Sequence, residues 1–150
     1  MKKRRAVRMR RLAGLAKTEE RRECEELGRV QRSLDQDEKR LDELEAYRKE
    51  YSRRFEGTQQ VAPARWQDYQ NFLQRIDHAM TDQRNNIQVG KQARDAHRQR
   101  WLVKRQKLES IERVVDRFQK SEDAAVERKQ QKSQDELYST ARINRDRSES

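Results

Sequence analysis

The 150-residue chain has little of what a globular enzyme is built from. It contains one cysteine, one proline, four glycines and two histidines, and hydrophobic residues make up only 31% of it. The lone Cys24 can form neither a disulfide nor a thiolate metal cluster within the chain. This fraction of apolar residues is too low to fill the core of a layered globular domain. The apolar side chains must therefore form a stripe along a secondary-structure element rather than a compact hydrophobic core.

Motifs that would indicate catalysis are also missing. The sequence has no glycine-rich phosphate loop and no cluster of histidine and cysteine, and its acidic residues are spread along the whole chain. Carboxylates that are common everywhere do not by themselves indicate an acid–base pair. We interpret His78 as outward-facing and His97 as a polar interruption of an apolar seam, because one isolated imidazole makes no metal site. We expect no enzymatic activity, and no catalytic, cofactor-binding or metal-ligating residues.

Long hydrophobic runs are absent as well. No apolar stretch approaches the roughly 20 residues that a membrane-spanning helix requires. The opening residues, MKKRRAVRMRRLAGLAK, are basic but contain no apolar stretch adequate for a signal peptide. We therefore expect the protein to stay in the cytosol, without a transmembrane segment of its own.

What the chain has in abundance is charge. Charged residues make up 43% of it, and the formal net charge is +10. The first eleven residues carry seven positive charges and no acid, from Lys2, Lys3, Arg4, Arg5, Arg8, Arg10 and Arg11. Beyond residue 11 acids and bases interleave, which is typical of a solvated helical surface. The basic N-terminal arm could bind nucleic acid, an anionic membrane or an acidic protein surface, and composition does not choose among them.

The apolar residues between Leu41 and Met80 recur at spacings of three and four, with one interruption between Gly57 and Pro63. Two such stripes around one helix breaker predict two helices that fold back on each other. We predict an all-α fold, a long two-helix antiparallel coiled-coil hairpin that is monomeric and forms a single domain. Its expected parts are a first helix at about 5–56, a turn at about 57–65, a second helix at about 66–138 and a frayed tail at 139–150.

Heptad frames fit both arms. In the first arm the a and d positions run from Leu27 to Phe55, and a thinner strip continues back to Ala6. In the second arm one frame holds for nine heptads from Trp66, which is a strong signal for a coiled coil. The frames and the loop length favour a register in which partner numbers sum to 124, and this register pairs Phe55 with Tyr69 and Leu34 with Gly90. We expect the stretch from Gln83 to Lys104 to be the most loosely packed, because its seam positions include Gly90 and His97.

Two aromatic residues near the turn, Tyr47 and Phe72, occupy g positions beside the seam. They extend the apolar stripe onto one flank of the predicted coil. Aromatic residues at such positions can simply cover the edge of the core. They can equally form a docking surface, because a rigid aromatic side chain buries much area for little lost rotamer freedom. The pattern leaves both interpretations open.

These residues carry a resemblance to a known family. The paired motifs YRKEY and WQDYQNFL are its specific part, and the similarity covers nearly the whole chain. The chain resembles the FliJ family of flagellar type III export proteins at Leu41, Leu44, Tyr47, Arg48, Glu50, Tyr51, Trp66, Tyr69, Phe72, Leu73, Ile76, Trp101, Arg128, Lys129, Gln130, Gln131, Lys132, Asp135 and Glu136. The resemblance implies an antiparallel coiled coil similar to the central stalk, the gamma subunit, of rotary ATPases.

The resemblance also implies a function and partners. A protein of this family is expected to bind within the flagellar export ATPase ring, promote its assembly and link it to the membrane export gate, with contacts to export chaperones. It would then be cytoplasmic and peripherally associated with the inner membrane at the flagellar export apparatus. The export-gate contact implied by the family matches Leu44, Tyr47, Tyr51, Phe72, Ile76 and Ala79.

We further hypothesise that an acidic pore of the ATPase ring attracts the basic end of the chain. The residues assigned to this contact are Arg4, Arg5, Arg8, Arg11, Leu108, Ile111, Val115 and Phe118.

The same sequence features would also suit the equivalent stalk of a virulence-type secretion system. A basic coiled-coil nucleic-acid binder is a further alternative, but it needs a basic helix continuous with a parallel dimer. The break at Gly57 to Pro63 opposes it, so we expect no nucleic-acid partner.

Overall fold

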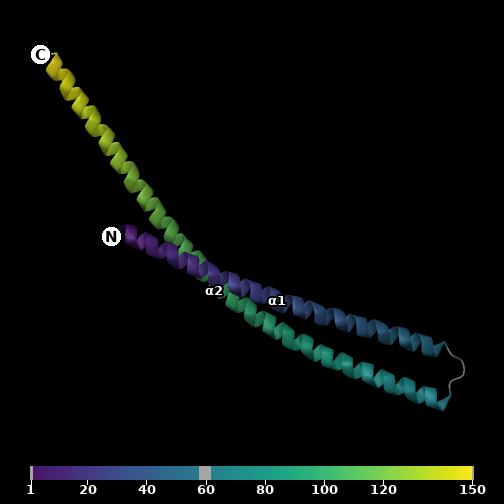
Figure 1. The fold of residues 1–150 in the computed structure, drawn as a ribbon. Helices are drawn as coiled ribbons and strands as arrows, with labels where there is room; N and C mark the ends of the chain where they lie inside the picture. The colour runs from purple at the N-terminus through teal and green to yellow at the C-terminus, as the bar shows by residue number, and fades with distance from the viewer. Residues whose placement is uncertain (1, 58–61, 150) are drawn as a thin grey trace. The chain divides into compact units, whose positions relative to one another are not determined.

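The computed structural model describes residues 2–57 and 62–149. They form two helices, α1 (Lys2–Glu56) and α2 (Pro63–Ser148), of 55 and 86 residues (Figure 1). The described residues contain no strand, and the two helices pack against each other. The prediction of an all-α helical hairpin is confirmed.

The helix ends near the break have local causes. The amide of Gly57 donates to the carbonyl of Arg53 at 3.2 Å, which completes the last turn of α1. α2 begins at Pro63, a few residues before the predicted start, because proline has no amide hydrogen to satisfy and suits the first helical position. The amide of Trp66 then donates to the carbonyl of Ala62 at 3.1 Å. The predicted turn extends over residues 58–61, which lie outside the described residues.

The prediction that the tail frays from residue 139 is wrong for residues 139–148. α2 continues to Ser148, because no glycine or proline follows Gly90 to interrupt its hydrogen bonds. Arg145 and Arg147 lie in the last turn, where positive charge suits the helix dipole. The hydroxyl of Thr140 also donates to the carbonyl of Glu136 at 2.9 Å. The side chains of residues 125–149 are exposed.

The chain divides into two compact units. Unit 1 consists of Met1–Glu19 with Arg105–Ser150, and unit 2 is Glu20–Lys104. Each unit therefore combines a segment of α1 with a segment of α2. The expectation of a single domain stays a prediction.

Unit 2 has the more apolar seam. Leu34 is 1% exposed, and Tyr69, Ile76, Met80 and Ile87 are also buried. Every predicted a and d position of the first arm between Leu27 and Phe55 is buried or half-buried. Among the predicted a and d positions of the second arm within this unit, Trp66 is the exception, because it occupies an a position but is 51% exposed. The heptad frame therefore describes the interior of this unit.

Two contacts in unit 2 confirm the predicted register. The rings of Phe55 and Tyr69 stack with their centroids 3.8 Å apart. Leu34 lies against Gly90, which has no side chain, and this permits a close approach of the two helices. Both pairs have partner numbers that sum to 124.

Polar side chains interrupt the seam of unit 2. Gln83, only 5% exposed, donates to the backbone carbonyl of Asp37 at 2.9 Å. Further along, Trp101 Nε1 donates to Glu20 at 2.8 Å. His97 Nδ1 is buried and has no hydrogen-bond partner among the described residues. These positions lie in the stretch from Gln83 to Lys104 that the sequence predicted to be loosely packed. At Gly90 that prediction is wrong, because the missing side chain lets the fully enclosed Leu34 pack closely against the backbone of α2.

Unit 1 has a thinner interior. Ala6 and Ala16 are buried, and Met9 and Ala13 are half-buried. Ion pairs add to this seam, from Arg10 to Glu122 at 3.5 Å and from Lys107 to Glu19 at 3.9 Å. Small side chains bury little apolar area, so unit 1 gains less from packing than unit 2 does.

Candidate functional site

Six aromatic residues of unit 2 form one continuous cluster across α1 and α2, namely Tyr47, Tyr51, Phe55, Trp66, Tyr69 and Phe72. Phe55 and Tyr69 are at its centre, and Tyr51 stacks on Tyr69 at 5.7 Å between centroids. Tyr51 also contacts Phe72 at 4.2 Å, and Tyr47 meets Phe72 edge-on at 5.8 Å. The cluster thus runs from the seam out to the flank that the g positions occupy.

The six residues predicted to contact the export gate all belong to unit 2 but differ in exposure. We call them the gate patch: Leu44, Tyr47, Tyr51, Phe72, Ile76 and Ala79. Tyr47 is 54% exposed and Ala79 is exposed, whereas Ile76 is buried. Leu44, Tyr51 and Phe72 are half-buried. The open part of the gate patch therefore consists of Tyr47, Ala79 and the outer edges of the half-buried side chains.

The opposite flank of unit 2 is charged. Arg48 Nε donates to Asp77 at 2.6 Å, and Glu45 and Arg84 form an ion pair at 3.5 Å. The hydrogen bond from Arg48 lowers the pKa of Asp77 below its ordinary value and raises the pKa of Arg48. Both ion pairs join α1 to α2. They hold the helices together on the side away from Tyr47, since e positions and g positions lie on opposite sides of the seam.

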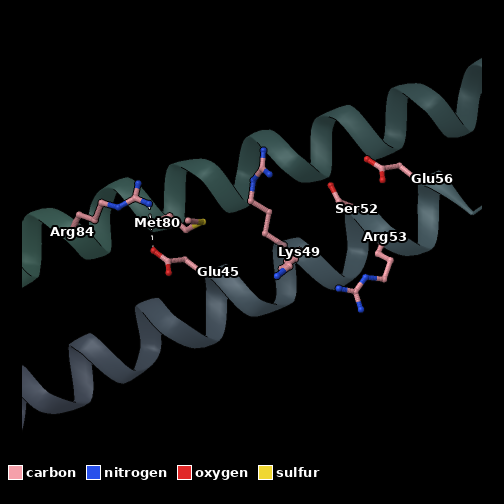
Figure 2. A pocket seen from close by; sticks show the side chains of 8 residues that line it. Glu45, Lys49, Ser52, Arg53, Glu56, Met80 and Arg84 are labelled. Carbon is pink, nitrogen blue, oxygen red and sulfur yellow. Dashed lines mark ion pairs between the residues drawn. The ribbon is translucent and has the colours of Figure 1, made fainter.

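A shallow groove of about 450 Å³ lies on this charged flank (Figure 2). Its lining consists of Glu45, Arg48, Lys49, Ser52, Arg53, Glu56, Met80 and Arg84. Figure 2 shows the Glu45–Arg84 ion pair spanning it beside Met80. The sequence interpretation missed this groove and its ion pairs. A signal was present, because Arg48 occupies a seam position opposite Ile76 and Asp77 follows at once.

The eight residues assigned to the ATPase ring all belong to unit 1 but differ in exposure. Arg4, Arg5, Arg8 and Arg11 are exposed. The four apolar residues, Leu108, Ile111, Val115 and Phe118, are half-buried at seam positions. Their side chains are partly covered by packing, so the arginines are the accessible part of this set. Arg10, which the assignment omitted, bonds to Gln119 as well as to Glu122.

The described part of the chain contains no group of three or more His, Cys, Asp or Glu side chains placed to ligate a metal ion. Within residues 2–57 and 62–149, neither helix has a stretch apolar and long enough to span a lipid bilayer. Cys24 and His78 are exposed. Protein surfaces, namely the gate patch and the basic end of α1, therefore remain as the candidates.

Comparison with known proteins identifies the family. The family model described as "Flagellar FliJ protein" matches residues 5–147. The chain is 27% identical over 121 residues to the flagellar FliJ protein of Escherichia coli (strain K12), covering 79% of this chain and 82% of that protein. It is 28% identical over 121 residues to the flagellar FliJ protein of Salmonella typhi, with the same coverage. No solved structure matches the chain.

The matched family is flagellar, which favours the flagellar prediction over the virulence-type stalk. The match extends over almost all of α1 and α2, so it includes both units. The chain belongs to the FliJ family and is a component of flagellar protein export.

Proposed function

We propose that the protein is a non-enzymatic stalk of the flagellar export apparatus. It binds within the export ATPase ring, promotes assembly of the ring and links it to the membrane export gate, with further contacts to export chaperones. It acts at the cytoplasmic face of the inner membrane as a peripheral component. The observation that carries this proposal is the exposed edge of the aromatic cluster at Tyr47, which is 54% exposed in a chain with few aromatic residues.

The gate patch suits a protein contact because its exposed ring is already held in place. Tyr47 rests edge-on against Phe72, which in turn contacts Tyr51. A supported aromatic side chain loses little freedom on binding, and tyrosine is among the residues enriched at binding hot spots. The partner would cover Tyr47 and Ala79 and reach the outer edge of Phe72.

Unit 1 is the proposed contact with the ATPase ring. Its exposed arginines, Arg4, Arg5, Arg8 and Arg11, supply the positive surface for an acidic pore. Attraction between exposed opposite charges is screened by salt within about 10 Å at 0.1 M ionic strength. This contact should therefore weaken with added salt, whereas the gate contact, which is mainly apolar, should not.

Binding to a purified cytoplasmic fragment of the export gate tests the gate contact. Tyr47→Ala should weaken binding by roughly 30-fold, as expected for a hot spot worth about 2 kcal/mol. Lys49→Ala, a substitution of an exposed residue that lines the groove on the charged flank, is the matched control and should bind normally. Normal gate binding by Tyr47→Ala would remove the patch from the function.

Stimulation of the export ATPase tests the ring contact separately. Removal of residues 2–11 should reduce both the stimulation and its salt sensitivity, while gate binding persists. Unchanged stimulation by the truncated protein at low and at high salt would reject the ring assignment.

A further inference from the structure

The first turns of α1 in unit 1 have two faces. Ala6 and Ala16 are buried against α2, and Met9 and Ala13 are half-buried beside them. Helical geometry places residues three and four apart on one side. The side opposite the seam is therefore occupied by Arg4, Val7, Arg8, Arg11 and Leu15, all of which are exposed. We call these five residues the outer basic face.

The cations of this face are not used within the described structure. In residues 2–57 and 62–149, Arg4, Arg8 and Arg11 form no ion pair, whereas Arg10 on the side of the helix bonds to Glu122. Together with Lys3 and Val7 these three arginines line a shallow hollow of about 330 Å³. Arg10 thus supports the fold, and its neighbours on the outer face remain available to a ligand.

The position of the cations does not suit the helix itself. The first turn of α1 contains no acidic residue, and the sequence has none before Glu19. The N-terminus of a helix carries the positive end of its dipole, so cations there are disfavoured. Positive charge that opposes local stability is better explained by an anionic partner than by helix formation.

Apolar side chains stand among these cations. Val7 is 53% exposed and Leu15 is 58% exposed. A helix that combines basic residues with exposed apolar ones is typical of binding at a membrane interface, where the cations meet lipid phosphates and the apolar side chains enter the headgroup boundary. A nucleic-acid backbone would use the arginines but leave Val7 and Leu15 without a favourable contact.

We propose that the outer basic face binds the surface of an anionic phospholipid bilayer, with Val7 and Leu15 inserted between headgroups and Arg4, Arg8 and Arg11 on the lipid phosphates. This inference goes beyond the ring contact and does not need it. Both use the same arginines, so one molecule cannot make both contacts at once with this face. The protein would then bind the membrane first and leave it when it binds within the ATPase ring.

Vesicle sedimentation of the full chain, without any ATPase, tests the proposal. The protein should bind vesicles containing phosphatidylglycerol and not vesicles of phosphatidylcholine alone. Each cation near an anionic surface contributes about a fivefold factor, so Arg4→Gln with Arg8→Gln and Arg11→Gln should lower partitioning roughly 100-fold.

The charge-matched control carries Arg22→Gln, Arg32→Gln and Arg100→Gln, three exposed arginines of unit 2. It has the same net charge and should keep most of the binding. Equal losses in the two triple variants would show a general effect of net charge and overturn the proposed face.

The apolar part needs its own variant. Val7→Ser with Leu15→Ser should lose vesicle binding at high salt, where electrostatic attraction is weak. Val89→Ser with Val103→Ser is the control, because both valines are exposed and lie in unit 2. Unchanged vesicle binding by the Val7 and Leu15 variant would exclude insertion of these side chains. Tighter binding of the wild-type chain to duplex DNA than to anionic vesicles at equal salt would overturn the membrane proposal and identify nucleic acid as the ligand of this face. Circular dichroism should show equal helicity in all four variants.

Discussion

Gly90 and Leu34 are in direct contact across the seam of unit 2. A Cβ atom added to Gly90 would lie 3.1 Å from Leu34 Cδ1, and Leu34 is only 1% exposed. A side chain so fully enclosed cannot move aside, because protein interiors are close-packed. Glycine at this point is therefore a packing requirement and not merely a weak helix former.

Gly90→Ala should destabilise the protein despite the better helix propensity of alanine. Alanine gains about 1 kcal/mol in a helix interior, whereas overpacking a filled core costs about 1 to 3 kcal/mol. Gly28→Ala is the control in the same unit, since its nearest neighbour is the flexible end of Arg32 at 3.4 Å. The free energy of unfolding in urea should fall for Gly90→Ala and rise or stay level for Gly28→Ala. Similar increases in the free energy of unfolding for both variants would mean that the Leu34 side chain can shift to accommodate the added methyl group.

Tyr47 and Tyr51 should separate binding from stability. Tyr51 is half-buried and contacts both Tyr69 and Phe72, so Tyr51→Ala should lower the unfolding free energy by about 2 to 4 kcal/mol. Tyr47 is 54% exposed, so Tyr47→Ala should change the unfolding free energy by less than about 1 kcal/mol. Thermal unfolding measures both. A large loss for Tyr47→Ala would show that this ring covers the core instead of forming a docking surface.

Gln83 should matter more for register than for stability. It is buried and bonds to the backbone carbonyl of Asp37, and a polar residue at one seam position can specify the pairing of two helices. Gln83→Leu should unfold at the same or a higher urea concentration. Gln74→Leu, on an exposed position of α2, is the control.

A cysteine pair reports the register in these variants. Glu45→Cys with Arg84→Cys replaces an ion pair between the helices, in a background where the exposed Cys24 is serine. Crosslinks should form within one chain in the wild-type seam and partly between chains after Gln83→Leu. Predominant crosslinking between chains in the wild-type seam would contradict the expected monomer.

The ion pair of Arg48 and Asp77 should contribute stability that depends on pH. The hydrogen bond from Arg48 lowers the pKa of Asp77, so its stabilisation is present above the unfolded pKa and is lost as pH falls through the folded pKa. The Asp77 side chain is 52% exposed, and solvent screening limits the effect to under about 1 kcal/mol.

Asp77→Asn should therefore lower the unfolding free energy near neutral pH and match the wild type at a pH acidic enough to protonate the carboxyl in the folded state, which lies below the ordinary range because Arg48 lowers the pKa of Asp77. Asp82→Asn, at an exposed position of the same helix, serves as the control. A deficit of Asp77→Asn that is equal at both pH values would mean that the side chain acts through packing and not through its charge.

Periodicity was sufficient to predict the seam and its register. Apolar side chains at a and d positions must be buried together, so the heptad frames alone place Leu34 against Gly90 and Phe55 against Tyr69, as the structure does. The end of α1 was predicted because Gly57 interrupts a clear pattern. The continuation of α2 to Ser148 was not predicted, because that part of the helix depends on propensity and end charges and has no apolar stripe.

The candidate sites were only partly predictable. Spacing placed Tyr47 and Phe72 on one flank, but the exposure of Tyr47 follows from how the rings pack. Leu108 and Phe118 were assigned to a contact surface, although their seam positions made partial burial expected. Ion pairs such as Arg48–Asp77 depend on the rotamers of long side chains, which a heptad frame does not determine.

The difference between the two flanks of unit 2 has a directional consequence. One flank is joined by Arg48–Asp77 and Glu45–Arg84, and the other presents the ring of Tyr47. A partner that binds through Tyr47 must approach the helix pair from the side on which this ring is exposed. A bound and anchored partner would therefore fix the rotational angle of unit 2, and any turning of the rest of the chain would have to be absorbed by twist in the helices.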